Sequence, residues 1–300
     1  MFTGCGTALV TPFARDFTLD EETLRRLIRR QIAEGIDFLV PCGTTGESPT
    51  LTRSEHLRVV EITVEEAHGK VPVLGGAGGY NTAEVISLAQ ELGHIGVDGI
   101  LSVTPYYNKP TQEGLYQHFL AIAESAGLPV VVYSVQGRTG VNVEPATLAR
   151  LAQIENIVGV KEASGNIAQM ASIVNRVPPD FLVLSGDDAV TLPLIALGGR
   201  GLISVVSNEI PGEMTQLVHC CLEGDFVAAR VLQRKYLALM EVNFIESNPI
   251  PVKSAMGLMG LLEPVFRLPM VAPKAENLDK IANVLSQLGL LAARSVPVAN

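Results

Sequence analysis

The chain has 300 residues, of which 47% are hydrophobic, and its formal net charge at pH 7 is −9. A nucleic-acid surface needs a basic field, so this charge and the lack of basic runs argue against a nucleic-acid partner. Gly, Pro and charged residues interrupt every long apolar segment, which argues against a membrane partner. A chain of this length and composition can bury a large core, and it fits either one α/β barrel or two smaller domains.

The N-terminal segment and the cysteines indicate the compartment. Residues 1–6 have neither the basic nor the long apolar part of a secretory signal. The four cysteines show no CxxC spacing and are too sparse for a disulfide framework; they are Cys5, Cys42, Cys220 and Cys221. We therefore expect a cytoplasmic protein.

From residue 7 onward, short β-rich runs alternate with amphipathic stretches. The runs are apolar at nearly every position, which is typical of parallel strands buried on both faces. In chain order the predicted strands are 7–10, 38–41, 71–75, 99–103, 129–133, 157–161, 181–185 and 201–205. Between and after them, apolar residues recur at helical spacing. The predicted helices are 24–32, 52–69, 82–92, 112–126, 145–153, 167–177, a short helix through 197, and 211–222.

Two polar segments predict where helices begin. Thr18–Glu21 and Thr52–Glu55 have the composition of capping boxes, in which side chains satisfy the free backbone donors of a first turn. We expect them to begin the first and second helices.

Eight strand–helix units predict a closed (β/α)8 barrel, the TIM barrel, because an open doubly wound sheet usually has fewer strands. After about residue 224 the pattern becomes purely helical, with helices at 225–242, 251–262 and 277–291. We therefore predict a catalytic barrel domain over residues 1–224. Residues 225–300 are predicted to form a C-terminal helical region that packs on the barrel or on a partner subunit.

One lysine, Lys161, ends the apolar run Ile157–Val160. Burial disfavours an ammonium group and lowers its pKa from a reference near ~10.4. A lysine that is partly neutral is a nucleophile and can form a Schiff base with a carbonyl compound. Taken alone, the segment favours a lysine that reaches solvent or a carboxylate from the strand end.

The other predicted strands also end in polar residues, and in such a barrel the active site lies at these ends. The residues are Thr44, Thr45, Glu47, Tyr106, Tyr107, Tyr133, Arg138, Asp187 and Asp188. Structural roles are the alternative: a turn, packed aromatic rings, a solvated charge or a helix N-cap. Lys161 would lie beside them, at one mouth of the barrel.

The sequence shows no HExxH, no His/Cys ligand cluster and no Gly-x-Gly-x-x-Gly segment, and its five histidines lie in helical patterns. We therefore expect neither a metal nor a nucleotide cofactor. A lysine nucleophile with a tyrosine and hydroxyl groups indicates an aldolase or lyase that works through an imine.

Three segments resemble motifs of the dihydrodipicolinate synthase family: 43–47, 133–140 and 159–165. The likeness continues at 104–108 and 248–253 and covers nearly the whole chain. This family belongs to the pyruvate-dependent class I aldolases, which include N-acetylneuraminate lyase. The resemblance implies a cofactor-free condensation of pyruvate with L-aspartate 4-semialdehyde to 4-hydroxy-tetrahydrodipicolinate, in lysine and diaminopimelate biosynthesis.

The resemblance also implies roles for the catalytic residues. Lys161 forms the Schiff base with pyruvate, and Tyr133 is the general acid/base. Thr44 and Tyr107 complete a proton relay, with Tyr107 reaching in from a neighbouring subunit. This sharing implies at least a dimer, and the family suggests a homotetramer built as a dimer of dimers.

For substrate binding, the resemblance implies that Thr44 and Thr45 hold the carboxylate of pyruvate and that Arg138 binds that of the semialdehyde. Gly186 and Ile203 line the pyruvate pocket through their backbone. Arg138 favours the synthase over sugar-acid lyases, which accommodate a polyol at that place. The Thr44–Thr45 pair points the same way, because sialic-acid lyases typically have Ser-Thr.

Many family members are inhibited by lysine at a dimer-interface cleft, and the matching positions are Ser48, His56, Glu84 and Tyr106. Three further positions of that cleft depart from the most familiar inhibited pattern of Ala, His and Asn; these are Pro49, Arg53 and Tyr80. Because Arg53 could repel a cationic ligand, lysine regulation stays open.

A second departure lies beside Arg138, where Ser134 and Gln136 replace the usual Asn and Pro. The missing proline frees one backbone dihedral and adds a donor, so we expect the loop to differ in shape or mobility. The second substrate is therefore less well determined than pyruvate. The alternatives are a sugar-acid or hydroxy-keto-acid aldolase, a non-catalytic keto-acid-binding paralogue, and a pyridoxal-phosphate barrel enzyme that lacks an evident phosphate loop.

Overall fold

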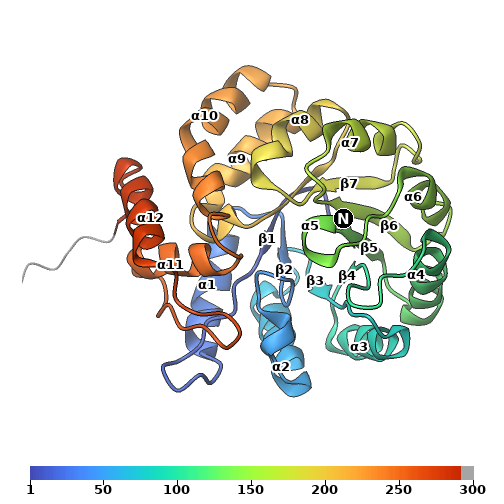
Figure 1. Cartoon of the computed structure of the whole chain (residues 1–300), viewed down its shortest axis with the longest axis horizontal. Helices are drawn as coiled ribbons and strands as arrows, with labels where there is room; N and C mark the ends of the chain where they lie inside the picture. The colour runs from blue at the N-terminus through green and yellow to red at the C-terminus, as the bar shows by residue number, and fades with distance from the viewer. Residues whose placement is uncertain (292–300) are drawn as a thin grey trace, which may run out of the picture.

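The computed structural model describes residues 1–291. Its eight strands are all parallel and follow the order β2-β1-β8-β7-β6-β5-β4-β3. A parallel bridge between Leu39 and Val73 joins the two ends of this order, so the sheet closes on itself. Helices surround the sheet, and the predicted (β/α)8 barrel is confirmed (Figure 1).

The strands lie within three residues of their predicted positions. They are β1 (Gly4–Ala8), β2 (Phe38–Val40), β3 (Leu74–Gly76), β4 (Gly99–Val103), β5 (Val130–Ser134), β6 (Ile157–Glu162), β7 (Leu182–Ser185) and β8 (Gly201–Ser204).

The predicted helices are likewise present. They are α1 (Glu21–Ala33), α2 (Arg53–Ala67), α3 (Thr82–Ile95), α4 (Gln112–Ala126), α6 (Pro145–Leu151), α7 (Ile167–Val174), α8 (Thr191–Ala196) and α9 (Pro211–Leu222). The C-terminal helices are α10 (Phe226–Val242), α11 (Ile250–Leu258) and α12 (Ala275–Gln287). The short helix α5 (Gln136–Thr139) and the 3-10 turns η1 (Ser48–Thr50), η2 (Asp188–Val190) and η3 (Val206–Asn208) were not predicted.

The side chains of each strand alternate between two cores, since successive residues of a strand point to opposite faces. In β5, Val130 and Val132 belong to the layer between sheet and helices, while Val131 and Tyr133 point into the barrel. In β6, Val160 belongs to the outer layer. The next residue of β6, Lys161, therefore points into the barrel.

The two predicted capping boxes have different outcomes. Thr52 caps α2 as predicted, with Glu55 reaching back to its backbone N–H. The prediction at Thr18 was wrong, because the Thr18 hydroxyl donates to Asp16 and Asp20 caps α1 by accepting from the backbone of Thr23.

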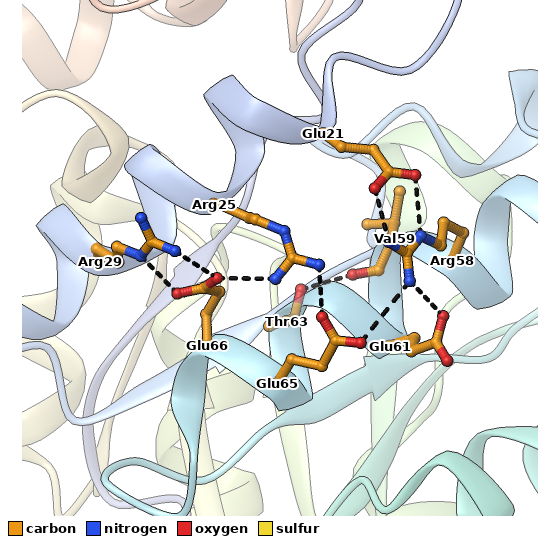
Figure 2. Close-up of polar contacts among 9 residues, drawn as sticks. All are labelled: Glu21, Arg25, Arg29, Arg58, Val59, Glu61, Thr63, Glu65 and Glu66. Carbon is orange, nitrogen blue, oxygen red and sulfur yellow. Dashed lines mark hydrogen bonds and ion pairs between the residues drawn. The ribbon is translucent and has the colours of Figure 1, made fainter.

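A network of ion pairs joins α1 to α2 (Figure 2). Arg25 and Arg29 both donate to Glu66, at 2.8 and 2.6 Å, and Arg58 pairs with Glu21 at 2.7 Å. The network therefore joins two neighbouring helices of the layer that surrounds the sheet.

The predicted domain boundary at residue 224 falls between α9 and α10, and the division into two domains stays a prediction. The helix α10 packs on α9, and α11 packs on α12. In Figure 1, α12 lies outside α11 on the side of the barrel away from α4, and Arg26 of α1 donates to Leu261 O, just after α11, at 2.8 Å.

Candidate active site

Lys161 and Tyr133 lie next to each other on the neighbouring strands β6 and β5. They are partners in the strand register, and Lys161 Nζ is 4.4 Å from the centre of the Tyr133 ring. Both side chains are buried, with relative exposures of 5% and 6%. The strand alternation described above therefore places an amine and a phenol together inside the mouth of the barrel.

Burial sets the protonation of both groups. It lowers the pKa of Lys161 to about 7; the charge of Arg138 acts in the same direction and that of Asp188 against it. Burial raises the pKa of Tyr133, although the charge of Arg138 and the hydroxyl of Thr44 act in the opposite direction. Near neutral pH the site thus holds a partly neutral amine beside a protonated phenol, as imine chemistry requires.

Lys161 lines a cavity of about 200 Å³, which has room for a small ligand. Residues from five strand ends and from the segment after α10 line it. They are Thr45, Tyr133, Val135, Arg138, Lys161, Ala163, Gly186, Asp187, Val205, Phe244 and Asn248.

Gly186 lies where only a glycine fits. A Cβ atom at this position would be 2.6 Å from Ala163 Cβ and 3.1 Å from Lys161 Cε. Any larger residue would push against the lysine, so the glycine keeps the cavity open beside it.

The loop over residues 43–51 brings one hydroxyl group to the Lys161 cavity and another to the cleft beside it. It is a series of tight turns, with Gly46 N donating to Gly43 O at 3.1 Å and left-handed backbone at Glu47. Thr45 is 3% exposed and lines the Lys161 cavity. Thr44 lies beside Tyr133 and lines a larger adjacent cleft of about 440 Å³.

Arg138 stands at the junction of the two cavities and lines both. It lies on α5, a single helical turn where a loop was predicted, and its Nη2 atom donates to Asn248 O at 3.3 Å. The carbonyl of Gln136, the first residue of this turn, accepts from Gly140 N at 2.9 Å, and the carbonyl of Val135 accepts from Arg138 N and Thr139 N, both at 3.0 Å. The Ser134 hydroxyl accepts from Val143 N at 3.1 Å and holds the chain that follows.

Two further residues were expected to act without a side chain beside the lysine of their own chain, Tyr107 from a neighbouring subunit and Ile203 through its backbone. Tyr107 is 87% exposed and lines a surface cavity of about 780 Å³ with Tyr80, Lys109 and Arg138. Ile203 is fully buried in the barrel interior with Tyr133.

The positions expected to bind lysine are divided. Ser48, His56 and Tyr106 line the 440 Å³ cleft. Glu84 is exposed in the first turn of α3 and does not line it. Arg53 lines the cleft but pairs with Glu91 at 2.8 Å, so its charge is already partnered.

Sequence reasoning missed Asn248, whose Nδ2 donates to Thr45 Oγ1 at 2.9 Å. It also missed Lys253, whose Nζ lies 2.6 Å from Glu47 Oε1. Both belong to the segment 248–253, which carried the resemblance but received no role. Polar residues within a C-terminal helical segment were the only signal available.

Residues 1–291 contain no group of three or more His, Cys, Asp or Glu side chains arranged to hold a metal ion. Over the same range, no helix combines the length and the apolar character that crossing a membrane requires.

A parallel barrel with a buried lysine and a tyrosine at one mouth defines an enzyme of the class I aldolase type. The model of the Dihydrodipicolinate synthetase family matches residues 1–288. The chain is 54% identical over 289 residues to a 4-hydroxy-tetrahydrodipicolinate synthase of Koribacter versatilis, covering 96% of each protein. The chain therefore belongs to the Dihydrodipicolinate synthetase family.

Solved structures show the same likeness. The chloride-inhibited dihydrodipicolinate synthase of Acinetobacter baumannii, complexed with pyruvate, superposes with a TM-score of 0.95 at 39% identity, over 97% of this chain and all of the other. The enzyme of Cyanidioschyzon merolae, with lysine bound, gives a TM-score of 0.93 at 39% identity, over 97% and 99% of the two chains.

Proposed function

We propose that the protein condenses pyruvate with L-aspartate 4-semialdehyde to give 4-hydroxy-tetrahydrodipicolinate. The observation that carries this function is the buried Lys161 beside Tyr133, in a chain of this family. The neutral amine attacks the keto carbon of pyruvate, and loss of water gives the imine. A proton then leaves the methyl carbon, and the resulting enamine adds to the aldehyde. Cyclisation through the amino group of the second substrate releases Lys161.

The other side chains have assigned roles in this scheme. Tyr133 moves the protons of imine and enamine formation, since its raised pKa keeps it protonated and it lies beside the amine. Thr44 and Tyr107 of a neighbouring subunit complete the proton relay. Thr45 binds the carboxylate of pyruvate, and the guanidinium of Arg138 suits the carboxylate of the semialdehyde.

The pyruvate pocket also involves two residues without polar side chains. Gly186 lines the cavity beside Lys161, which supports its role in lining the pyruvate pocket. Ile203 acts through its backbone at the end of β8. The pyruvate complex of the Acinetobacter baumannii enzyme supports this choice of first substrate.

Reductive trapping tests the function. Incubation with pyruvate and borohydride is expected to add a pyruvate-derived mass to Lys161, and an unmodified lysine would contradict the imine mechanism. Turnover with L-aspartate 4-semialdehyde is then compared with turnover of sugar aldehydes. Faster turnover of a sugar aldehyde would favour a sugar-acid aldolase instead.

We propose that the protein is a homotetramer, a dimer of dimers. Exposed apolar side chains support two separate contact surfaces. One contains Tyr80, Tyr106 and Tyr107, which are 50%, 37% and 87% exposed; the other contains Val227 and Val231, at 69% and 64%. Sedimentation is expected to give four copies of the 31.9 kDa chain, and a monomer at micromolar concentration would contradict the proposal.

Lysine inhibition is a second proposal, supported by the lysine-bound relative and by Ser48, His56 and Tyr106 in the cleft. Arg53 adds a cation to the lining that its exposed pair with Glu91 offsets only in part, so we expect binding weaker than in a cleft without that charge. Titration calorimetry with lysine tests this, and Arg53→Gln should bind lysine more tightly.

A cytoplasmic location is proposed from the four free cysteines.

A further inference from the structure

Asn248 connects the two residues that are proposed to bind substrate carboxylates. Its Nδ2 atom donates to Thr45 Oγ1 at 2.9 Å, and its backbone oxygen accepts from Arg138 Nη2 at 3.3 Å. Asn248 is 4% exposed and lines the Lys161 cavity. A residue that is 203 positions from Thr45 in the chain thus reaches the end of the cavity assigned to pyruvate.

The direction of the Asn248–Thr45 hydrogen bond has a chemical consequence. A threonine hydroxyl has one hydrogen to donate and lone pairs that accept. Because the amide NH2 of Asn248 donates, it occupies a lone pair of Thr45 and leaves the hydroxyl hydrogen free. The Thr45 hydroxyl has no other partner among residues 1–291, so this hydrogen is available to an acceptor in the cavity.

A buried ion pair fixes the relation between Asn248 and the threonine loop. Lys253, on the helix α11 that follows Asn248, donates from Nζ to Glu47 Oε1 and to Val265 O, both at 2.6 Å. The Lys253 and Glu47 side chains are only 0% and 1% exposed. Glu47 comes two residues after Thr45, so the pair ties this loop to α11.

A second contact holds the same loop from outside. Arg267 donates to Thr50 O at 3.1 Å and pairs with Glu55 at the start of α2. The loop is therefore bound to the C-terminal region at both Glu47 and Thr50. Because these two contacts hold the loop, Thr45 stays within hydrogen-bonding distance of Asn248.

We propose that Asn248 is a positioning residue for pyruvate binding: by donating to Thr45 it directs the threonine hydroxyl hydrogen toward the substrate carboxylate. The Lys253–Glu47 pair keeps Asn248 and Thr45 within hydrogen-bonding distance. This role rests on the proposed function, because it requires pyruvate in the Lys161 cavity.

The test measures reductive trapping of Lys161 as a function of pyruvate concentration, which needs no second substrate. For Asn248→Ala we expect the half-saturating pyruvate concentration to rise about 5- to 10-fold, the usual effect of losing one hydrogen bond. The maximal trapping rate should change much less, because Lys161 and Tyr133 are untouched. Asn248→Asp should raise the concentration further, since its carboxylate accepts the threonine hydrogen and repels the pyruvate carboxylate.

A double-mutant cycle separates positioning from a merely structural role. In the Thr45→Val background, Asn248→Ala should have almost no further effect on half-saturation, because the hydroxyl that it orients is gone. Ser254→Ala is the matched control: within residues 1–291 the hydroxyl of this buried residue of α11 bonds to Ile250 O alone, at 2.8 Å, and its loss should leave half-saturation unchanged.

The outcomes are distinct. Equal effects of Asn248→Ala with and without the Thr45 hydroxyl would overturn the inference, as would an unchanged half-saturation in both Asn248 variants. Thermal unfolding identifies any variant that does not fold, and the Asp variant, which keeps the size of Asn, then carries the test. If the wild-type protein itself is not trapped by pyruvate, the proposed function fails and the inference fails with it.

Discussion

Lys161 Nζ lies 4.4 Å from the ring centre of Tyr133, and the two residues are direct partners in the register of β6 and β5. The sheet itself therefore sets the distance between the amine and the phenol, with no loop between them. A relation built into strand pairing is rigid, which favours catalytic groups that must act on the same atom.

The rate of imine formation should depend on pH through Lys161. Because its pKa is lowered to about 7, the fraction of neutral amine, and with it the trapping rate, should rise as the pH increases through about 7 and then level off. Cyanoborohydride trapping with pyruvate measures this profile. The Asp188 charge raises the pKa of Lys161, so Asp188→Asn should shift the midpoint to lower pH. A midpoint near that of an ordinary lysine would contradict the burial argument.

Arg138→Ala should raise KM for L-aspartate 4-semialdehyde by about 10- to 100-fold, since a hydrogen-bonded charge pair with the substrate is lost. Trapping by pyruvate alone should continue in this variant. Arg138→Lys keeps the charge but loses the bidentate geometry, so its KM for the semialdehyde should lie between those of the wild-type protein and Arg138→Ala. Unchanged kinetics with the semialdehyde would show that another group binds its carboxylate.

Sequence alone predicted the barrel because its evidence is local. The apolar runs mark the strands, and the rule that strand ends converge assembles Lys161, Tyr133 and Thr45 without any coordinates. The contacts that the sequence did not predict are long-range. Asn248 meets Thr45 across 203 positions, and Lys253 meets Glu47 across 206, so no periodicity could pair them.

Short-range errors had a different cause. Thr18 has the composition of a helix cap, but the hydroxyl bonds to Asp16, and a competing local partner of this kind cannot be ranked from composition. The helical turn that carries Arg138 was missed because its four residues are too few to show a period.

Tyr107 should act in the active site of a neighbouring subunit, because it is 87% exposed and does not line the Lys161 cavity of its own chain. Lys161→Ala and Tyr107→Phe should each have little activity alone. Subunits of the two variants that are dissociated, mixed and reassembled should regain activity, since some sites then combine an intact lysine with an intact tyrosine. If the mixture stays as inactive as its components, Tyr107 serves its own chain or has no catalytic role.

Lys253→Met should lower the free energy of unfolding by about 3–5 kcal/mol, because it leaves the Glu47 carboxylate buried without its partner. Chemical denaturation measures this loss. The double variant with Glu47→Gln should recover part of the stability, since no unpaired charge remains. Arg15→Met, which removes the exposed pair with Glu263, is the control and should have no measurable effect. A Lys253 variant as stable as this control would show that the pair contributes nothing.

Glu66→Gln should weaken the link between α1 and α2, because Glu66 binds both Arg25 and Arg29 (Figure 2). The side chain is only 11% exposed, so we expect a loss of about 1 kcal/mol in the free energy of unfolding, smaller at high salt. The bond to Arg29 lowers the pKa of Glu66, so its contribution is present above the unfolded pKa of about 4.5 and disappears as the pH falls through the lower folded value. The destabilisation should therefore be seen in urea unfolding at neutral pH and vanish in strong acid. Glu113→Gln, in the pair with Arg150 whose side chains are 58% and 51% exposed, should show a much smaller loss because solvent screens that pair; losses of equal size in the two variants would mean that the shared glutamate adds nothing to the network.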